Sequence, residues 1–457
     1  MNEKIRKIGI FAMAVIFIGS LFIKQQWLND IDQLLLVIVL LLSLLNVKGT
    51  SRVIGWILFL AGAAIFIIYR AGAGMWLEGI SRNLYLVVMF SLVPLLGLPI
   101  RNGGYMKELQ AFFKHHVRKD KQFYIFVNLI TFAVSTMVNI AAIPLMYQIC
   151  QASDKSKNVK LLATAIVRGF SACIIWAPSY AAVALIMELT GAQWMHFFPY
   201  ALIAGILALL PGWFMIASKN TDAVDGFSPE NQAEVETYSQ PNWAKIIELG
   251  FFCLLLIVGI VVVSNKTGIT TVSVVSIFSL CFPLAWMAII KKLPEMLQAV
   301  KEQYYGQSLG KLSNEVVLFI GAGFFATAVG FSHLGDLVPQ MLTYLVHNNA
   351  LGFSCVVISL AIILGILGVH PIITVTVIGS TVHPQAFNLT PTMMAITLSA
   401  SWALATAASP SSATNIAMAG LINRSVDIGP RWNTVYAFTA MVLVVLAMGC
   451  FRFWGLL

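Results

Sequence analysis

The sequence predicts an all-α polytopic membrane protein with about eleven transmembrane helices and two re-entrant hairpins in an inverted repeat. Three observations predict this fold class. Of the 457 residues, 59% are hydrophobic and only 10% are charged, far below the roughly 25% charged residues of a soluble domain. The apolar residues gather in runs of membrane-spanning length. Two unusual features also recur at one spacing in the two halves of the chain.

This composition excludes a soluble enzyme, a disordered scaffold and a secreted disulfide-linked domain. The six cysteines are scattered through apolar runs without a close pair, so they indicate neither a metal cluster nor a redox motif. The net charge of +9 would suit a nucleic-acid partner, but the placement of the basic residues favours a different explanation.

Nine apolar runs are long enough to cross a membrane without a break. They lie near 6–23, 31–46, 52–69, 84–100, 195–217, 244–264, 269–289, 314–331 and 432–456. Two more spans, 161–190 and 391–422, are long but interrupted near the middle. The runs 123–150 and 352–380 have polar or proline-containing centres, so we expect two re-entrant hairpins that do not cross.

The basic residues fix the expected orientation. With the N-terminus in the cytoplasm, 22 of the 28 lysines and arginines fall on the cytoplasmic side, as the positive-inside rule predicts. This count requires both hairpins to return to the side from which they enter. We therefore expect a multi-pass protein of the cytoplasmic membrane with its C-terminus outside and no nucleic-acid partner.

The chain divides into two halves around a polar stretch. Residues 1–30 form a first transmembrane helix outside the repeat, with no convincing cleavage site. The first repeat is 31–217, a cytoplasmic linker is 218–243, and the second repeat is 244–457. The segments 101–121 and 290–311 mix charged and apolar residues, so we expect helices along the inner surface.

An offset of 232 residues superposes the two halves. The first hairpin centres on 135–139, and Pro178 follows Asn139 by 39 residues. The second hairpin centres on 368–371, and Pro410 follows Pro371 by 39 residues. By the charge count the hairpins enter from opposite sides. This pattern is typical of transporters whose discontinuous helices meet near the bilayer midplane.

The order of hairpin, broken helix and span resembles the ion transporter superfamily, and most closely its divalent-anion:sodium symporter branch. The tip Ser135-Thr136-Met137-Val138-Asn139 is similar in outline to the Ser-Asn-Thr tips of that branch. Ala177-Pro178-Ser179 and Ser409-Pro410-Ser411 look like its Thr-Pro-Pro-Asn turns, whereas Val369-His370-Pro371 departs from the pattern. The resemblance implies a homodimer in which a scaffold holds a moving transport domain.

The second half supplies polar groups without charge, because no Asp, Glu, Lys or Arg lies between Leu337 and Asn423. A charged ligand there must be held by backbone groups and helix ends. For a single serine, close helix packing or backbone satisfaction at a kink is the stronger interpretation. Clustered beside a helix-breaking proline, these residues favour a binding site: Ser409, Ser411, Ser412, Thr414 and Asn415.

The first half supplies the matching candidates Ser135, Thr136 and Asn139 at its tip, and Pro178 with Ser179 at its break. The tip residues could equally cap the second hairpin helix. Arg168 lies inside a span, where it could pair with substrate or with a structural partner. His370 could couple a proton or cap its tip.

These features predict a secondary active transporter that moves a small organic or inorganic anion, carboxylate-like, coupled to Na⁺ or H⁺. A cation/proton antiporter of the same superfamily and a flippase for a lipid-linked anion are the alternatives. No hydrolase, zinc-protease or phosphate-loop motif is present, so no enzyme activity is expected. The expected partners are the lipid bilayer and the anion. No cofactor or metal is expected apart from Na⁺ at the tips.

Overall fold

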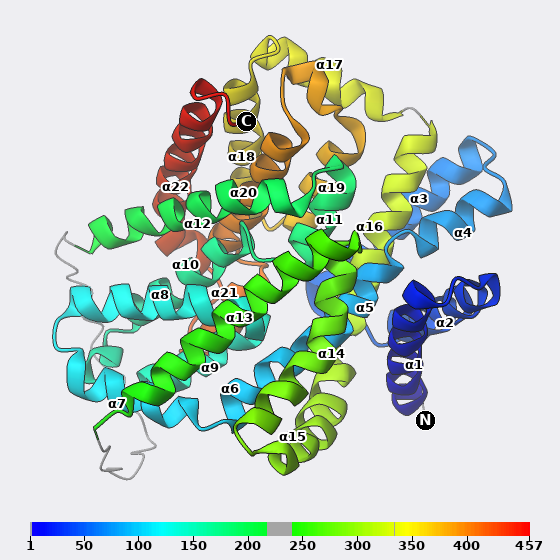
Figure 1. Ribbon diagram of the computed structural model, residues 1–457. Helices are drawn as coiled ribbons and strands as arrows, with labels where there is room; N and C mark the ends of the chain where they lie inside the picture. Colours follow the sequence, from blue (N-terminus) through cyan, green and yellow to red (C-terminus); the bar gives the residue numbers. More distant parts are fainter. Residues whose placement is uncertain (1, 217–239, 333) are drawn as a thin grey trace.

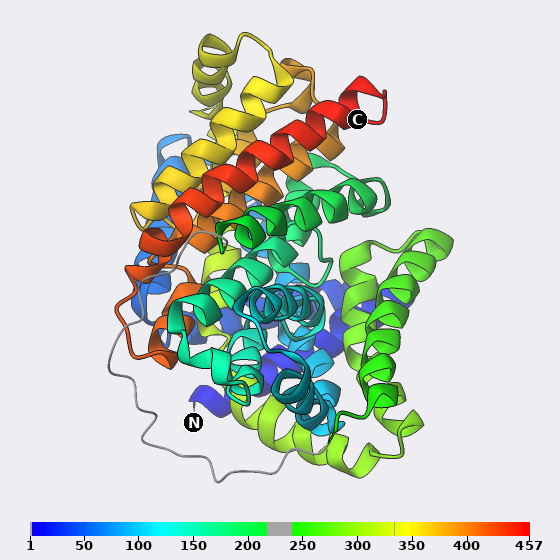
Figure 2. The ribbon, with the colours of Figure 1, turned by 90° about the vertical axis from the view of Figure 1, so that its left-hand side faces the viewer.

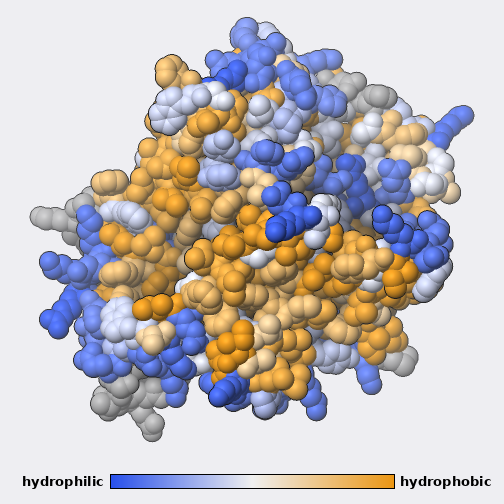
Figure 3. Space-filling model, viewed as in Figure 1, coloured by the Kyte–Doolittle hydropathy of each residue, from blue (hydrophilic) through white to orange (hydrophobic). Residues whose placement is uncertain are grey.

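The computed structural model describes residues 2–216, 240–332 and 334–457. Every regular element within these residues is a helix, and ten helical segments there are long and apolar enough to cross a membrane. The chain is therefore an all-α polytopic membrane protein, as predicted. Figure 3 shows apolar residues across the middle of one face, with hydrophilic residues gathered above them and at the lower left.

The first half of the chain (Figure 1) forms α1 to α12. Their bounds are α1 (Asn2–Phe22), α2 (Gln26–Leu44), α3 (Gly49–Ile68), α4 (Ala73–Ser81), α5 (Leu84–Leu92), α6 (Leu98–Asn102), α7 (Tyr105–His116), α8 (Asp120–Val138), α9 (Ala142–Cys150), α10 (Val159–Ile174), α11 (Ala181–Thr190) and α12 (Trp194–Met215). Short 3₁₀ turns join α5 to α6 (Val93–Gly97) and α8 to α9 (Asn139–Ala141).

The second half forms α13 to α22. Their bounds are α13 (Trp243–Thr267), α14 (Thr271–Ile289), α15 (Leu293–Ala299), α16 (Ser313–Ser332), α17 (Leu337–Val346), α18 (Ala350–Ile366), α19 (Pro371–Thr381), α20 (Pro391–Ala408), α21 (Ala413–Leu421) and α22 (Ile428–Phe453). A π-helical segment, Val300–Ser308, continues α15.

Nine of the ten candidate spans coincide with the nine unbroken runs expected from the sequence, and the tenth is the expected hairpin region Asp120–Cys150. The span expected at 84–100 forms part of a longer helical stretch, Ala73–Asn102. Most of the expected linker, 218–239, lies outside the described residues. The expected surface segments contain α7 and α15, and α17 bends by 115° into α18.

Both expected hairpins bring their two ends back together. Asp120, the first residue of α8, forms an ion pair of 2.9 Å with Lys155, which follows α9. Asn388, which follows α19, donates a hydrogen bond of 3.2 Å to the Asn348 carbonyl, just before α18. A segment that crossed would separate its ends by roughly 30 Å. Each hairpin therefore returns to the end of the molecule from which it starts.

The two interrupted helices break where the prolines predict. The first broken helix is α10 and α11, separated by 175–180, and the second is α20 and α21, separated by 409–412. Pro178 and Pro410 lie inside these gaps, where a residue without an N–H group cannot continue the backbone ladder. The order of hairpin, broken helix and long helix thus recurs in both halves.

The hairpins and broken helices pack into one body. The broken helices contact each other through α10 and α20, α8 lies along α10, and α18 lies along α20. The halves also exchange contacts, because α9 packs against α21 and α11 packs against α19. In two views the N-terminus and α7 lie at one end of the molecule, and the C-terminus and α17 lie at the other (Figures 1 and 2). The membrane side of each end stays a prediction.

We predict opposite labelling of the two hairpin bases in a cysteine-free background. Lys155→Cys should react with an impermeant thiol reagent only from the cytoplasmic side, and Gln385→Cys only from outside, because each hairpin returns to its own end. The measurement is labelling in intact cells compared with inverted membrane vesicles. Labelling of both positions from the same side would contradict the inverted orientation.

Candidate functional site

A cavity of about 500 Å³ lies where the hairpin tips and the helix breaks meet. Tip residues of both hairpins line it, as do residues of both breaks and of the helix turns that follow them. The lining from these elements includes Asn139, Ile140, Tyr180, Ala181, Ala182, His370, Ile372, Ser411, Ser412, Ala413 and Thr414. The structure thus brings together the four features that the sequence singled out.

Corresponding positions of the two halves form much of this lining. Six pairs of lining residues are separated by the same 232 positions. These pairs are Ile140 and Ile372, Phe170 and Trp402, Ile174 and Thr406, Tyr180 and Ser412, Ala181 and Ala413, and Ala182 and Thr414. Three of these positions carry Thr or Ser in the second half, and none does in the first. The cavity is therefore pseudo-symmetric in position and asymmetric in polarity.

The same offset relates two hydrogen bonds that hold each tip on its own break. The Ser179 hydroxyl donates to the Thr136 carbonyl in the first half. The Ser411 hydroxyl donates to the Gly368 carbonyl, at 2.9 Å, in the second half. Both donors lie 43 residues after their acceptors. These two serines fix the hairpins to the broken helices.

Helix N-termini converge on the cavity from several directions. The first residues of α11 and α21 line it, and so does Ile372 in the first turn of α19. Tyr180, the N-cap of α11, makes no side-chain cap hydrogen bond. The free N–H groups and the positive end of the helix dipole at such termini favour an anion.

Side chains of the second half add hydroxyl groups that remain available. Thr406 and Thr414 line the cavity, and neither side chain hydrogen-bonds within the described part of the chain. His370 accepts a hydrogen bond of 3.2 Å from the Ile372 N–H through Nδ1, so its ring caps α19. The His370 ring also lies perpendicular to the Trp402 ring, with the ring centres 6.0 Å apart.

A third wall comes from residues that the sequence did not single out. Lys48 contributes from the α2–α3 loop, Thr50 and Ser51 from the first turn of α3, and Asn314 and Glu315 from the first turn of α16. The Lys48 N–H donates to Asn314 Oδ1 at 3.0 Å and joins the two elements. The buried Glu315 Oε2 has no hydrogen-bond partner within the described residues. An acidic residue this close to the end of an apolar run is typical of the membrane–water interface. The sequence pattern therefore did not indicate that Glu315 belongs to the site.

The cavity extends towards the end of the molecule that carries the N-terminus. Arg6, in the first turns of α1, donates a hydrogen bond of 2.7 Å to the Gly310 carbonyl and another to the Ser313 hydroxyl. The N-terminus therefore lies beside the start of α16, whose next residues line the cavity. By the predicted topology this is the cytoplasmic end.

Of the twelve residues predicted for the site, five line the cavity: Asn139, His370, Ser411, Ser412 and Thr414. The other seven do not: Ser135, Thr136, Arg168, Pro178, Ser179, Ser409 and Asn415. Ser135 and Thr136 are buried in the last turn of α8, and the Thr136 hydroxyl donates to the Ala133 carbonyl at 2.6 Å. Ser409 is buried and lies 2.9 Å, hydroxyl to hydroxyl, from Ser411.

Arg168 lies away from the cavity and links the two halves. Its guanidinium donates to Asn433 Oδ1 at 2.9 Å, to the Tyr124 hydroxyl at 3.0 Å and to the Trp432 carbonyl at 2.8 Å. It also lies 4.7 Å from the centre of the Tyr436 ring. These contacts join α10 to α8 and α22, and they favour the structural role of the two that the sequence left open.

The two asparagines of the prediction differ. Asn415 Nδ2 lies within hydrogen-bonding distance of the Thr406, Ala407 and Ser409 carbonyls, at 2.8–3.2 Å. Its amide therefore satisfies the C-terminal carbonyls of α20 and does not face the cavity. Asn139 lines the cavity while its Oδ1 accepts from the Ile140 N–H at 2.7 Å.

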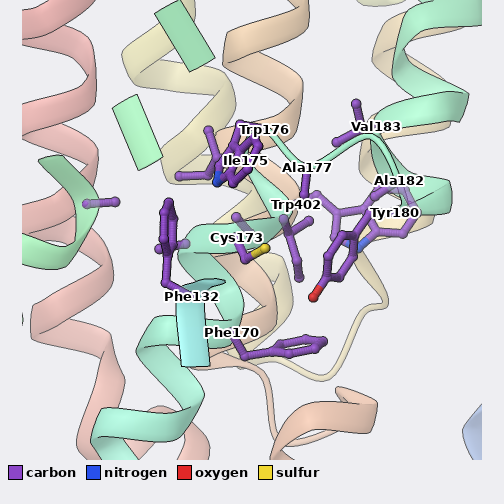
Figure 4. Close-up of a cluster of buried hydrophobic side chains, with 14 of the residues drawn as sticks. Phe132, Phe170, Cys173, Ile175, Trp176, Ala177, Tyr180, Ala182, Val183 and Trp402 are labelled. Carbon is purple, nitrogen blue, oxygen red and sulfur yellow. The ribbon is translucent and has the colours of Figure 1, made fainter. Parts of the chain in front are cut away.

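Aromatic side chains support the first break. The ring centres of Phe132 and Trp176 lie 5.7 Å apart, and those of Phe170 and Tyr180 lie 5.6 Å apart. Figure 4 shows these side chains around the turn after α10, with Trp402 of the second half beside Tyr180. The first break therefore lies among apolar side chains, in agreement with the lower polarity of the cavity lining that the first half contributes.

No protein-family model and no curated protein sequence matches the chain. Among solved structures, the chain is similar to the YdaH transporter of Alcanivorax borkumensis, whose crystal structure is described as revealing an unusual topology. The TM-score is 0.56 and the identity 13%, over 80% of this chain and 85% of that one. The chain therefore shares the fold of a membrane transporter. The closer resemblance to the divalent-anion:sodium symporter branch stays a prediction.

We predict that Asn415→Ala lowers the free energy of unfolding by about 1–3 kcal/mol, because buried carbonyls lose their donor. Thermal unfolding of the purified protein in detergent measures this effect. Thr414→Val is the matched control, since the neighbouring hydroxyl has no hydrogen bond to lose and the volume is nearly kept. Unchanged stability of Asn415→Ala together with lost ligand binding would instead make the amide a ligand.

Proposed function

We propose that this chain is a secondary active transporter that carries a small, carboxylate-like anion across the cytoplasmic membrane, coupled to H⁺ or Na⁺. The observation that carries the proposal is the cavity at the junction of two hairpin tips and two helix breaks. Breaks of this kind are tolerated at membrane depth only where they are buried in protein or line a cavity. Such junctions are where transporters of this architecture bind their substrates.

The chemistry of the lining supports an anion. The first turns of α11, α19 and α21 line the cavity. His370 and Ser412 each accept one N–H of α19 and α21, whereas α11 has no side-chain cap, and Thr406 and Thr414 add hydroxyl donors. An anion buried without such donors would cost several kcal/mol. Among the described residues the lining contains one basic residue, Lys48, which lies in the wall next to α16. At the tips and breaks, helix ends and hydroxyls would hold the charge.

A second pocket supports access from the other end of the molecule. It has a volume of about 320 Å³ and is lined by Arg82, by the C-terminal ends of α11 and α19, and by the loop after α19. The N-terminal ends of the same two helices line the central cavity, and the helices pack against each other. The α11–α19 pair therefore separates the cavity from this pocket, and we propose that the pair moves with the hairpins as an elevator.

Glu315 is the candidate for carrying the coupling ion. Its carboxylate is the one acidic side chain in the cavity lining among the described residues, and its buried Oε2 has no partner. A buried, unpaired carboxylate is costly unless it takes up a cation, and a proton is the smallest that serves. The same observation favours a cation/proton antiporter as the second candidate function.

We predict that the purified protein, reconstituted into liposomes, accumulates a radiolabelled carboxylate from a panel when a proton or sodium gradient is imposed. Thr414→Val should lower this uptake at least tenfold, because one hydroxyl donor to a buried charge contributes about 1.5–3 kcal/mol. The control is Thr439→Val, since Thr439 faces outward from α22. Equal uptake by both variants would remove Thr414 from the site.

We predict that Glu315→Gln separates coupling from transport. Accumulation driven by a proton gradient should disappear, while exchange of labelled for unlabelled anion continues, because the amide cannot carry the proton. Glu188→Gln is the control, since Glu188 is an exposed acid near the end of α11. If Glu315→Gln abolishes cation/proton exchange in a protein that moves no anion, the antiporter is the correct function.

A further inference from the structure

Two lysines from different helices meet at one backbone carbonyl. Lys245, in the first turn of α13, donates from Nζ to the Gly103 carbonyl at 3.2 Å. Lys292, just after α14, donates to the same oxygen at 3.2 Å. The two ammonium groups are therefore close neighbours at the junction of α6 and α7.

The backbone conformation at this junction leaves room for both lysine side chains. Gly104 has a φ of +94°, a backbone conformation that residues other than glycine rarely adopt. A Cβ atom at this position would lie 2.8 Å from Lys245 Nζ and 3.6 Å from Lys292 Nζ. Glycine thus leaves the space beside both ammonium groups open.

The positive charge at this position is not balanced by an ion pair. Neither lysine makes a salt bridge within the described part of the chain. The nearby Glu248 accepts a hydrogen bond from the Tyr105 hydroxyl, which also accepts from Trp286 Nε1 at 2.9 Å. Two like charges that share one neutral acceptor repel each other, and an anion between them would relieve the repulsion.

The position fits the headgroup region of a membrane. Lys245 lies at the start of one candidate span and Lys292 directly after the end of the next. The adjoining helix surfaces are apolar, since Ile247 is 68% exposed and Ile289 is 67% exposed. Trp243, half exposed, stands at the start of α13, where aromatic side chains mark the interface.

We propose that Lys245 and Lys292 bind the phosphate of an acidic glycerophospholipid, with its acyl chains along the outer surfaces of α13 and α14. Ammonium groups are strong donors to phosphate, and basic pockets between membrane helices on the predicted cytoplasmic side suit such headgroups. The bound lipid would fasten the α13–α14 hairpin to α6 and α7. This inference does not depend on the proposed transport activity.

The test is thermal unfolding of the full-length protein in neutral detergent. Phosphatidylglycerol should raise the midpoint by about 2 °C or more, whereas phosphatidylcholine with the same acyl chains should not. The double variant Lys245→Gln, Lys292→Gln should lose the shift. Lys266→Gln is the control, because Lys266 lies at the opposite end of α13 and is exposed.

Three outcomes of the unfolding experiment would overturn the proposal. They are an equal shift with both lipids, a full shift in the double variant, and an equal shift with inorganic phosphate alone, which would assign the site to a free anion.

If the double variant does not fold, the single variant Lys292→Gln and the charge-preserving pair Lys245→Arg, Lys292→Arg replace it. The first should weaken retention of phosphatidylglycerol in native mass spectrometry and the second should keep it; equal retention by Lys292→Gln and the wild type would overturn the proposal.

Discussion

The rest of the structure depends on one constraint, which is that a helix interrupted inside a membrane leaves backbone N–H and C=O groups without partners. The described residues contain two such interruptions and two hairpin tips. The carbonyls of Thr136 and Gly368 at the tips are satisfied by serine hydroxyls of the breaks, and the end of α20 by the Asn415 amide. What remains unsatisfied at the helix N-termini faces a cavity. The cavity thus results from which backbone groups at the breaks find hydrogen-bond partners and which do not.

The positions of spans, hairpins and breaks were predictable because the length of each apolar run and the positions of the prolines can be read directly from the sequence. The offset of 232 predicted which tips and breaks correspond, and the serine-to-carbonyl hydrogen bonds follow it. The roles of Arg168 and Asn415 were harder to predict, because the sequence around a polar residue inside a span does not distinguish a ligand-binding side chain from one that binds a backbone carbonyl. Only the partners Asn433 and Trp432, 264 or more residues away in the sequence, decide for Arg168.

Glu315 and Lys48 could not be assigned for a different reason. Both lie near the ends of apolar runs, where charged residues ordinarily meet water. Their place in the cavity depends on α16 packing along α3 and on the α2–α3 loop reaching Asn314. These are contacts between residues more than 250 positions apart, and no local pattern encodes them.

Corresponding residues of the two halves lie at the central cavity and at the pocket at the opposite end of the molecule. Asn314 and Glu315 line the central cavity, and the residues 232 positions before them are Arg82 and Asn83. Arg82 lines the pocket at the opposite end, while Asn83 is buried and donates to the Phe319 carbonyl of α16 at 2.8 Å. If the halves exchanged conformations in the proposed transport cycle, Asn83 would take the place that Glu315 has now. The access routes would then differ in charge, because Lys48 accompanies Glu315 at one end, whereas the described residues that line the other pocket give Arg82 no acidic neighbour. Such an asymmetry would attract an anion more strongly at the C-terminal end, whereas the direction of net movement would still be set by the gradients of the anion and of the coupling ion.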